Sequence, residues 1–584
     1  MTGDVKRLLA LAIVLALAIA SEACARRATG PAVSLPELVR SYDREVTPYY
    51  PLTASEVGLD QYDRVFANDI GAQYREGLRE LCARYRQDLR RVDRAALSAG
   101  ELLTHDIFEN RLDTCVESLG LPWHLLPVNQ AGSWPTRFPI LGMGRGSHPF
   151  KTVRNYEDFL GRMDGFVVWV DTAIENMRVG ISRGITQPRD AMVKLVPQLD
   201  AHIVEDPRAS AFYEPLKSFP ASFDEAARRS ITERYLEAIE RKIVPTYRKL
   251  RAFVQDEYIP RCRTSYGLAE IPGGRDMYRQ AVRVATTTGL SPDEIFELGR
   301  REVRRLRGEI DALRAEIAAQ QDAEPVSYQD VETLLRGYGE LRASVEAALP
   351  RLFGRFPRAG FEVRAIEAYR ELSTPSSYQG SSPDGTRPGV FYLNTSELRS
   401  SGTARVSRSL FLHEAVPGHH LQLALQRENR QLPGFRRFDW FIAFGEGWAL
   451  YAESLGHELG VYQARHDRLD ALIGERFRAA RLVVDVGLHE KGWTREQAID
   501  FIGGRRENAE REVERYMVWP AQALGYHIGN LRIRALRTKA EAALGAAFDV
   551  RAFHDELLKD GTMPLSILEV KMDRWIEARR RKPS

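Results

Sequence analysis

Apolar residues recur three or four positions apart through most of this 584-residue chain, and this spacing limits its fold more than any other feature. Clear examples are residues 34–46, 76–92, 155–180 and 291–320. Such spacing places the apolar side chains on one face of an α-helix. Ser291, followed three residues later by Glu294, has the pattern of a capping box at a helix start. We therefore expect a mostly α fold.

Strand signals are sparse. Residues 361–366 (FEVRAI) alternate apolar and polar side chains, and residues 389–395 (GVFYLNT) are aromatic and β-branched. The turn-rich segment 373–389 lies between them, and a helix is expected to begin near Thr403. We expect a small sheet beside that helix. Residues 121–150, rich in proline and glycine, predict a long structured loop of the kind that often carries binding residues.

The length of the chain predicts more than one subdomain. The sequence IPGGRD interrupts the helical pattern near residue 270. This break divides the chain into an N-terminal helical subdomain, 26–270, and a second subdomain, 271–584. The formal net charge is only +3, and no basic stripe with interleaved aromatic residues is present, so nucleic acid is not an expected partner.

The N-terminus has the pattern of a signal peptide over residues 1–25. Lys6 and Arg7 precede an apolar run, 8–20, that is too short to span a bilayer comfortably. Two interpretations remain open. Cleavage after Ala23 or Ala25 would release an exported protein into the periplasm. Alternatively, Cys24 carries the lipid of an outer-membrane lipoprotein, which would be the chain's sole contact with a membrane.

Three further cysteines, Cys82, Cys115 and Cys262, lack the spacing of a zinc site. In an oxidising compartment Cys82 and Cys115 could pair and join two neighbouring helices. Three buried free thiols are the alternative.

Residues 411–422, FLHEAVPGHHLQ, contain three histidines within eight positions of a chain that has 12. His413 and Glu414 begin like the zinc motif H-E-x-x-H, but Pro417 occupies the position of the second histidine. On an unbroken helix His420 would share a face with His413 at a distance of about 10.5 Å. That is too far for one ion with ligand bonds of about 2.0–2.2 Å. His419 would face another direction.

Pro417 and Gly418 offer a solution, because proline breaks a helix and glycine relaxes the backbone. A two-residue bulge at this point would bring His419 to the place of the missing histidine. His420 is the alternative ligand, or else a group that contacts the substrate.

A third ligand is expected from residues 444–453, FGEGWALYAE, where Glu446 begins a helix and Glu453 follows two turns later. Two histidines and one carboxylate leave an open coordination position on Zn²⁺ for water. Glu414 is then placed to take a proton from that water. The alternative is that both acids are surface residues of the helix.

Several motifs, in order, resemble the bacterial domain-of-unknown-function family 885. They are TASEVGLDQYD (53–63), DGTRPGVFYLNT (384–395), HEAVPGHHLQ (413–422), FGEGWALYAE (444–453), RLVVDVGLHEKGWT (481–494) and ERYMVWPAQALGYHIG (514–529). That family is in turn similar to gluzincins, which are helical metallopeptidases with a deep channel, such as angiotensin-converting enzyme. The resemblance implies a zincin-like fold and favours His419 and Glu446 as ligands.

The resemblance also implies roles for other residues. Tyr516, within Arg-Tyr-Met-Val, would stabilise the oxyanion, and Arg515 would fix helices or substrate. Tyr526 is a weaker candidate for contact with the substrate. The strand at 389–395 would receive a peptide by edge pairing. Asp485 and His489, four positions apart, either support the site or form a simple pair on a helix surface.

The sequence therefore predicts an exported zinc hydrolase, most simply a metallopeptidase that cleaves short peptides through a metal-activated water. Two rival hypotheses are a non-catalytic binding lipoprotein on a peptidase scaffold and a non-haem iron enzyme, since two histidines and a carboxylate also bind Fe(II).

Overall fold

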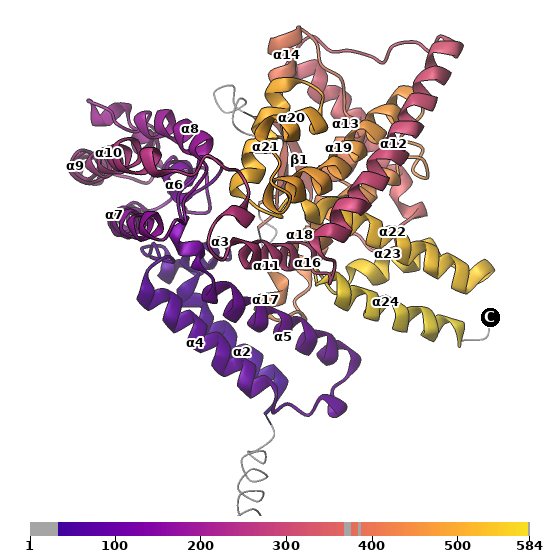
Figure 1. Cartoon of the computed structure of the whole chain (residues 1–584), viewed down its shortest axis with the longest axis horizontal. Coiled ribbons are helices and arrows are strands. Elements are labelled where there is room, and N and C mark those ends of the chain that lie inside the picture. Colours follow the sequence, from indigo (N-terminus) through magenta and orange to yellow (C-terminus); the bar gives the residue numbers. More distant parts are fainter. Residues whose placement is uncertain (1–32, 367–374, 383–386, 582–584) are drawn as a thin grey trace, which may run out of the picture.

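The computed structural model describes residues 33–366, 375–382 and 387–581 and is mostly helical, with one small sheet (Figure 1). The four helices expected from apolar spacing are present as α2 (Leu35–Val46), α4 (Ala72–Leu89), α7 (Val153–Ser182) and α12 (Pro292–Gln320). The signal peptide predicted over residues 1–25, with Cys24, lies outside the described residues. Among the described helices, none combines the length and apolar character that crossing a membrane requires.

The other helices of the N-terminal half are α3 (Pro51–Glu56), α5 (Ala99–Gly120), α6 (Trp134–Gly142), α8 (Arg189–Asp200), α9 (Glu225–Ala238) and α10 (Val244–Ala252). Because α6 lies within 121–150, the prediction of one long loop there is wrong in part. The capping box at the start of α12 is confirmed, since Ser291 and Glu294 each accept the other's backbone N–H.

The C-terminal half supplies the remaining helices. They are α11 (Gly274–Thr286), α13 (Val331–Ala348), α14 (Ser396–Ser401), α15 (Arg408–Glu414), α16 (His419–Glu428), α17 (Gly434–Arg437), α18 (Ile442–Ser454), α19 (Arg465–His489), α20 (Arg495–Ile502), α21 (Arg506–Val518), α22 (Leu524–Leu544), α23 (Val550–Leu558) and α24 (Leu565–Arg580). The helix expected near Thr403 begins at Arg408, because the Ser407 hydroxyl accepts the N–H of Leu410 and caps α15 there.

Within the described residues, three strands form the sheet, in the order β1–β3–β2. The two predicted strands are β1 (Phe361–Ala365) and β3 (Gly389–Leu393), which pair in parallel with Phe361 opposite Gly389. The third strand, β2 (Ser377–Gln379), is antiparallel to β3 and lies in the segment predicted to be a loop. Because β3 is central, β2 forms an edge of the sheet.

The hydrophobic cores do not divide at one point in the sequence. One core gathers residues between Phe66 and Ile259, most of them from α6 to α10. The largest core joins side chains of α2, α4 and α5 to side chains of α11, α18, α22 and α24. Within the C-terminal half, α12 packs along α19 and α18 packs along α22. The predicted boundary near residue 270 stays a prediction.

Cys82 of α4 and Cys115 of α5 form a disulfide across the two helices, with their Cα atoms 6.4 Å apart. This decides between the two interpretations that the sequence left open for these residues. Cys262 is a free, partly exposed thiol. The disulfide joins helices that contribute to the largest core.

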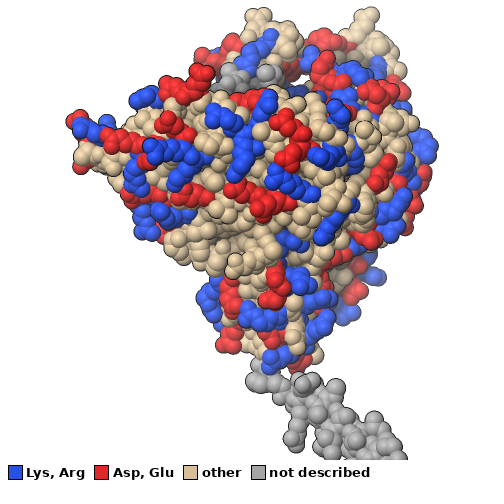
Figure 2. All heavy atoms as spheres, turned by 60° about the vertical axis from the view of Figure 1, so that its left-hand side comes forward, with Lys and Arg blue, Asp and Glu red and all other residues tan. Residues whose placement is uncertain are grey.

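Basic and acidic side chains are interspersed on the face shown in Figure 2, and no large area of that face carries one sign. Neighbouring charges pair, for example Lys242 with Asp164 and Arg234 with Glu157. The charge of this face therefore gives no ground for proposing a highly charged partner.

Replacing Cys82 and Cys115 together by alanine should lower the free energy of unfolding by about 3–4 kcal/mol, because a cross-link over a separation of 33 residues restricts the unfolded chain. Denaturant unfolding of the oxidised protein measures this. The matched control, Cys262→Ala, removes a thiol outside the disulfide and should change stability by less than about 1 kcal/mol. Equal midpoints for the double variant and the control would contradict a stabilising disulfide.

Candidate metal centre

The helix that carries His413 breaks after Glu414, where the sequence places Pro417 and Gly418. α15 ends at Glu414, α16 begins at His419, and the Val416–Pro417 peptide bond between them is cis. The indole N–H of Trp448, on α18, donates to the carbonyl of Pro417 at 2.9 Å. This hydrogen bond attaches the bend to the helix that carries Glu446.

Gly418 has no room for a side chain. A Cβ atom built on it would lie 1.9 Å from the carbonyl oxygen of His413 and 2.4 Å from that of Leu412. Both distances are far shorter than van der Waals contact. The close approach folds the start of α16 back onto the end of α15, so the two histidines meet although six positions separate them.

His413, His419 and Glu446 converge on one point. The Nε2 atoms of His413 and His419 lie 3.5 and 3.4 Å from the same Glu446 oxygen, Oε2. One ligand atom from each of the three residues lies within 4.8 Å of the others. Two atoms bound to zinc at about 2.0–2.1 Å in tetrahedral geometry are themselves about 3.3–3.4 Å apart. The three side chains therefore have the spacing and the chemistry that a zinc ion requires.

Glu453 orients His413 from behind. Its Oε1 accepts from Nδ1 of His413 at 2.8 Å, so Nε2 is the ring nitrogen that faces Glu446. Arg478 contacts the same Glu453 oxygen at 3.3 Å. Burial alone would lower the pKa of His413, but hydrogen bonds to Glu446 and Glu453 outweigh it and raise the pKa to about 9. A carboxylate behind a histidine is the usual support of a metal ligand.

Glu414 is buried next to His413 and faces the same space. Burial raises the pKa of its carboxyl, and Glu446 acts in the same direction, whereas the charges of His413 and His419 oppose the shift. A carboxylate with a raised pKa is a better proton acceptor than an exposed one.

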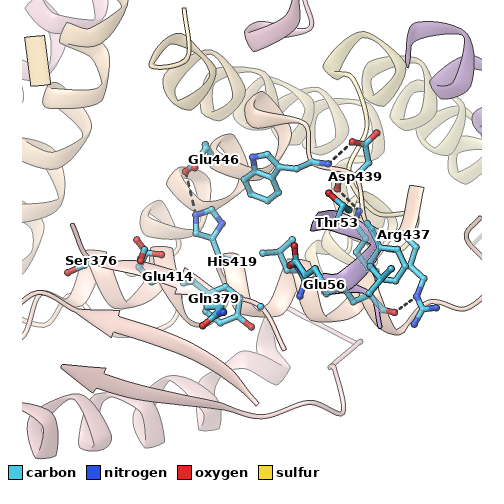
Figure 3. A pocket seen from close by; sticks show the side chains of 18 of the residues that line it. Thr53, Glu56, Ser376, Gln379, Glu414, His419, Arg437, Asp439 and Glu446 are labelled. Carbon is cyan, nitrogen blue, oxygen red and sulfur yellow. Dashed lines mark hydrogen bonds and ion pairs between the residues drawn. The ribbon is translucent and has the colours of Figure 1, made fainter. Parts of the chain in front are cut away.

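A cavity of about 650 Å³ opens in front of these groups. Figure 3 shows His419, Glu446 and Glu414 on one side of it and Thr53, Glu56, Asp439 and Arg437 on the other. The edge strand β2 contributes all three of its residues, Ser377 to Gln379, to the lining. The cavity is therefore walled by α3, β2 and the metal-site helices, and its polar groups come from both halves of the chain.

The structure brings Tyr526, rather than Tyr516, to this cavity. The Tyr516 side chain is fully buried and its hydroxyl donates to Glu512 at 2.5 Å; it is not among the described residues that line the cavity. Tyr526 lines the cavity, and burial together with nearby Glu446 raises its pKa to about 12. The guanidinium of Arg481 lies 4.7 Å from the centre of the Tyr526 ring. Tyr526 is thus a neutral hydroxyl donor at neutral pH.

Arg515, predicted to fix helices or substrate, belongs to a buried polar network behind Tyr526. It contacts Glu512 at 2.9 Å and Gln522 at 2.5 Å. Arg481 reaches the same Glu512 oxygen at 3.2 Å. Because of these cations, the pKa of Glu512 falls to about 2 despite its burial. These contacts join α19, α21 and the start of α22, and they favour a role in helix placement.

His420 faces away from Glu446. Its Nδ1 lies 2.8 Å from the Tyr378 hydroxyl, and its ring packs against Phe361 with centroids 4.6 Å apart. Burial lowers its pKa to about 4. His420 therefore holds the sheet against α16, and of the two candidate ligands only His419 points to the other members of the site. His420 reaches the cavity indirectly, since its partner Tyr378 lines it.

Asp485 and His489 are fully buried, so they are not a surface pair. Asp485 accepts from the Tyr278 hydroxyl at 2.7 Å and from the N–H of Ala521 at 3.0 Å. Ring Nε2 of His489 lies 2.9 Å from the carbonyl of Tyr516. Both residues hold the turn between α21 and α22, which sets the position of Tyr526. Burial raises the pKa of Asp485 to about 7.

Two glycines let the backbones of α18 and α22 approach closely. A Cβ atom on Gly447 would lie 2.4 Å from the Cα of Gly529, and one on Gly529 would lie 1.9 Å from the carbonyl of Ala443. α18 carries Glu446 and α22 carries Tyr526. This contact therefore fixes the distance between a candidate ligand and the hydroxyl donor.

A second group of metal-ligand types, Glu302, Glu475 and His527, lies behind the site. Arg305 contacts Glu302 at 2.7 Å and Glu475 at 3.4 Å, and Arg534 contacts Glu475 at 3.2 Å. Two guanidinium groups already balance the two carboxylates. These residues therefore form an ion-pair network, and the paired charges disfavour a bound cation.

Sequence reasoning named Glu453 without giving it a role and missed other residues of the site. Glu453 lies seven positions after Glu446, a spacing that places both on one helix face, so periodicity could have identified its supporting role. Thr53 and Glu56 on α3, and Trp440 just before α18, carry no comparable signal. They reach the cavity only through long-range packing.

Comparison with known proteins identifies one family. The model of the family described as "Bacterial protein of unknown function (DUF885)" matches residues 51–572. A search of curated proteins finds no match. Two solved structures are similar in fold. A protein of Colwellia psychrerythraea, provisionally described as a lipoprotein, has a TM-score of 0.84 at 24% identity, with 93% of this chain and 99% of that chain covered.

The second structure is a protein of Shewanella oneidensis, provisionally described as a lipoprotein of unknown function. It has a TM-score of 0.70 at 17% identity, with 93% of this chain and 100% of that chain covered. At these identities the likeness shows a shared fold alone.

Replacing Gly418 by alanine should destabilise the protein by about 1–3 kcal/mol, because the new methyl group would overlap two carbonyl oxygens. Thermal or denaturant unfolding measures this. The control is Gly339→Ala on α13, where a Cβ atom would meet nothing within 4 Å. Alanine there should leave stability unchanged or raise it slightly. A Gly418→Ala protein as stable as the control would mean that the bend tolerates a side chain.

Proposed function

We propose a metal-dependent hydrolase, starting from the fact that this chain belongs to the DUF885 family of bacterial proteins, whose function is unknown. The reaction is hydrolysis of short peptides, and the metal is zinc, held by His413, His419 and Glu446. The fold is of the zincin type, and its substrate channel is the cavity in front of these residues.

One observation supports this proposal above all others. Two buried histidines and a partly buried glutamate, the residue types that bind catalytic zinc, meet at the wall of a cavity of about 650 Å³. The Nε2 atoms of both histidines lie within 3.5 Å of the same Glu446 oxygen. Two histidines and one carboxylate leave an open position on the ion for water or substrate. A structural site would use four protein ligands and would not face a cavity.

Zinc held there would polarise a carbonyl group and lower the pKa of a water molecule. The residues of the chain supply the remaining chemistry. Glu414 accepts the proton of the attacking water and delivers it to the leaving amine. Tyr526 donates its hydroxyl hydrogen to the carbonyl oxygen as negative charge develops on it, a role first expected for Tyr516. Glu453 holds the His413 ring in the tautomer that a ligand requires.

The edge strand β2 favours an extended peptide as substrate. Strand β3, expected from sequence to receive the peptide, has both edges occupied by β1 and β2. β2 pairs with β3 alone among the described residues, and it lines the cavity. A peptide added to its outer edge would run past the metal centre and gain main-chain hydrogen bonds.

We also propose that the protein is exported, to the periplasm or, with a lipid on Cys24, to the outer membrane. The apolar run after Lys6 and Arg7 supports export, and the Cys82–Cys115 disulfide suits an oxidising compartment. The names of the two similar structures agree with this location.

Glu414→Gln should reduce peptide hydrolysis by about 10²–10⁴-fold while the bound metal is retained, because the proton acceptor is lost and the ligands remain. Peptide-library hydrolysis with and without a chelator, together with elemental analysis, measures both effects. The control is Glu332→Gln on α13, whose side chain is 87% exposed. Metal binding without hydrolysis in the wild type would favour the binding-protein alternative, and iron with oxygen consumption would favour the oxygenase.

Tyr526→Phe should lower kcat by about 10²-fold and change KM little, because the lost hydroxyl acts on charge that develops only in the transition state. Tyr516→Phe removes only a hydrogen bond to Glu512 and should change kcat much less. Steady-state kinetics of the two folded variants compares them directly. A larger loss in kcat for Tyr516→Phe than for Tyr526→Phe would contradict the proposal that Tyr526 stabilises the oxyanion and would favour Tyr516.

A further inference from the structure

A second cavity of about 410 Å³ adjoins the first one, and the two share Thr53 and Glu56 of α3 as lining residues. In Figure 3 these two residues lie across the cavity from His419 and Glu446. The second cavity therefore begins at the end of the first that is remote from the metal centre. Its other walls come from the segment before α3, from residues 66–74 and from 134–147.

Aromatic rings dominate the second cavity. They belong to Tyr49, Tyr50, Phe66, Tyr74 and Trp134. Tyr49 and Tyr74 pack edge to face at 5.1 Å, and the Tyr74 hydroxyl donates to the carbonyl of Tyr49 at 2.7 Å. Phe66 and Trp134 also pack edge to face, at 5.1 Å. The rings hold one another in place, so the cavity is a preformed site for another flat, apolar group.

Arg137 adds a cation to this aromatic site. Its guanidinium lies 4.9 Å from the centre of the Trp134 ring, and the residue lines the cavity from α6. In the described part of the chain no carboxylate pairs with Arg137. The two nearby acids have other partners, since Asp69 accepts from the Trp169 indole at 2.7 Å and Glu56 accepts from Arg427 at 3.3 Å. The hydrogen-bond donors of Arg137 are therefore available to a ligand.

An aromatic wall and an unpaired guanidinium together select a particular chemistry. The guanidinium binds a carboxylate through two parallel hydrogen bonds, and the rings bind an aromatic side chain. A single residue offers both groups when a peptide ends in phenylalanine, tyrosine or tryptophan with a free α-carboxylate.

We propose that the second cavity binds the carboxyl-terminal aromatic residue of the peptide substrate, with its carboxylate on Arg137. This inference rests on the proposed function for the identity of the substrate. The bond that is cleaved then lies upstream of the bound terminus, at a separation set by the span between Glu446 and Arg137. A peptide too short to reach both cavities binds poorly.

Binding is tested on the full-length, metal-loaded Glu414→Gln protein, so that no turnover interferes. The probe is acetyl-tetraalanyl-phenylalanine, with its C-terminus either free or amidated, and calorimetry measures Kd. The free acid should bind about tenfold or more tightly than the amide, because the amide loses a charge-assisted hydrogen-bond pair. Adding Arg137→Gln should remove this preference, whereas adding Arg229→Gln, at an exposed arginine of α9, should preserve it.

Hydrolysis by the otherwise wild-type enzyme supplies the second measurement. Across acetyl-oligoalanyl-phenylalanine peptides of increasing length, kcat/KM should rise about tenfold or more at the length that spans both cavities. Arg137→Gln should raise KM for the long peptides and leave kcat nearly unchanged.

The outcomes separate this inference from the proposed function. A preference for the free acid that depends on Arg137, without hydrolysis of any peptide, would support the second cavity as a binding site and overturn the hydrolase. Hydrolysis that is indifferent to amidation or to Arg137→Gln would overturn the second-cavity proposal and leave the hydrolase intact.

Discussion

The hydrogen bond from the Trp448 indole to the Pro417 carbonyl is the contact on which the arrangement of the site depends. It joins the bend between α15 and α16 to α18. The bend places His413 and His419 side by side, and α18 carries Glu446. Together with the hydrogen bond between His413 and Glu453, which also joins α15 to α18, the indole hydrogen bond fixes the two histidines relative to the carboxylate. Its donor and acceptor are both buried, so breaking it would leave two unsatisfied polar groups.

Close packing between α18 and α22 also fixes the position of Tyr526 relative to Glu446. At Gly447 and Gly529 the backbones of α18 and α22 are in contact, and the turn that starts α22 is held from below by Asp485. The candidate metal ligand Glu446 and the candidate hydroxyl donor Tyr526 thereby lie on two helices whose backbones are in direct contact. Preorganisation of this kind lets a site stabilise charge without first rearranging.

Local features of the site could be predicted from sequence. The long helices follow from apolar spacing. The helix break at Pro417–Gly418 follows because proline has no backbone N–H to donate and glycine has no side chain. With the break in place, His419 becomes the partner of His413. The choice of Tyr516 over Tyr526 rested on a four-residue resemblance, whereas the position of each hydroxyl depends on how α21 packs on α19. β2 was missed because three residues among turn formers carry too little pattern to identify a strand.

Long-range contacts left no signal in any single segment. Thr53 and Glu56 reach the cavity because α3 packs beside it, and the pairing of Cys82 with Cys115 depends on how α4 and α5 align. Both facts belong to the tertiary structure, and periodicity or spacing within one helix cannot encode them.

The first and last described helices, α2 and α24, belong to the same hydrophobic core. Leu35 and Ile576 are both buried in it, although nearly the whole chain separates them. During synthesis this core stays incomplete until the final helix has left the ribosome, so folding of the N-terminal helices cannot finish while translation continues. A chain whose core closes so late stays unfolded for longer, which would suit the export that we propose for it.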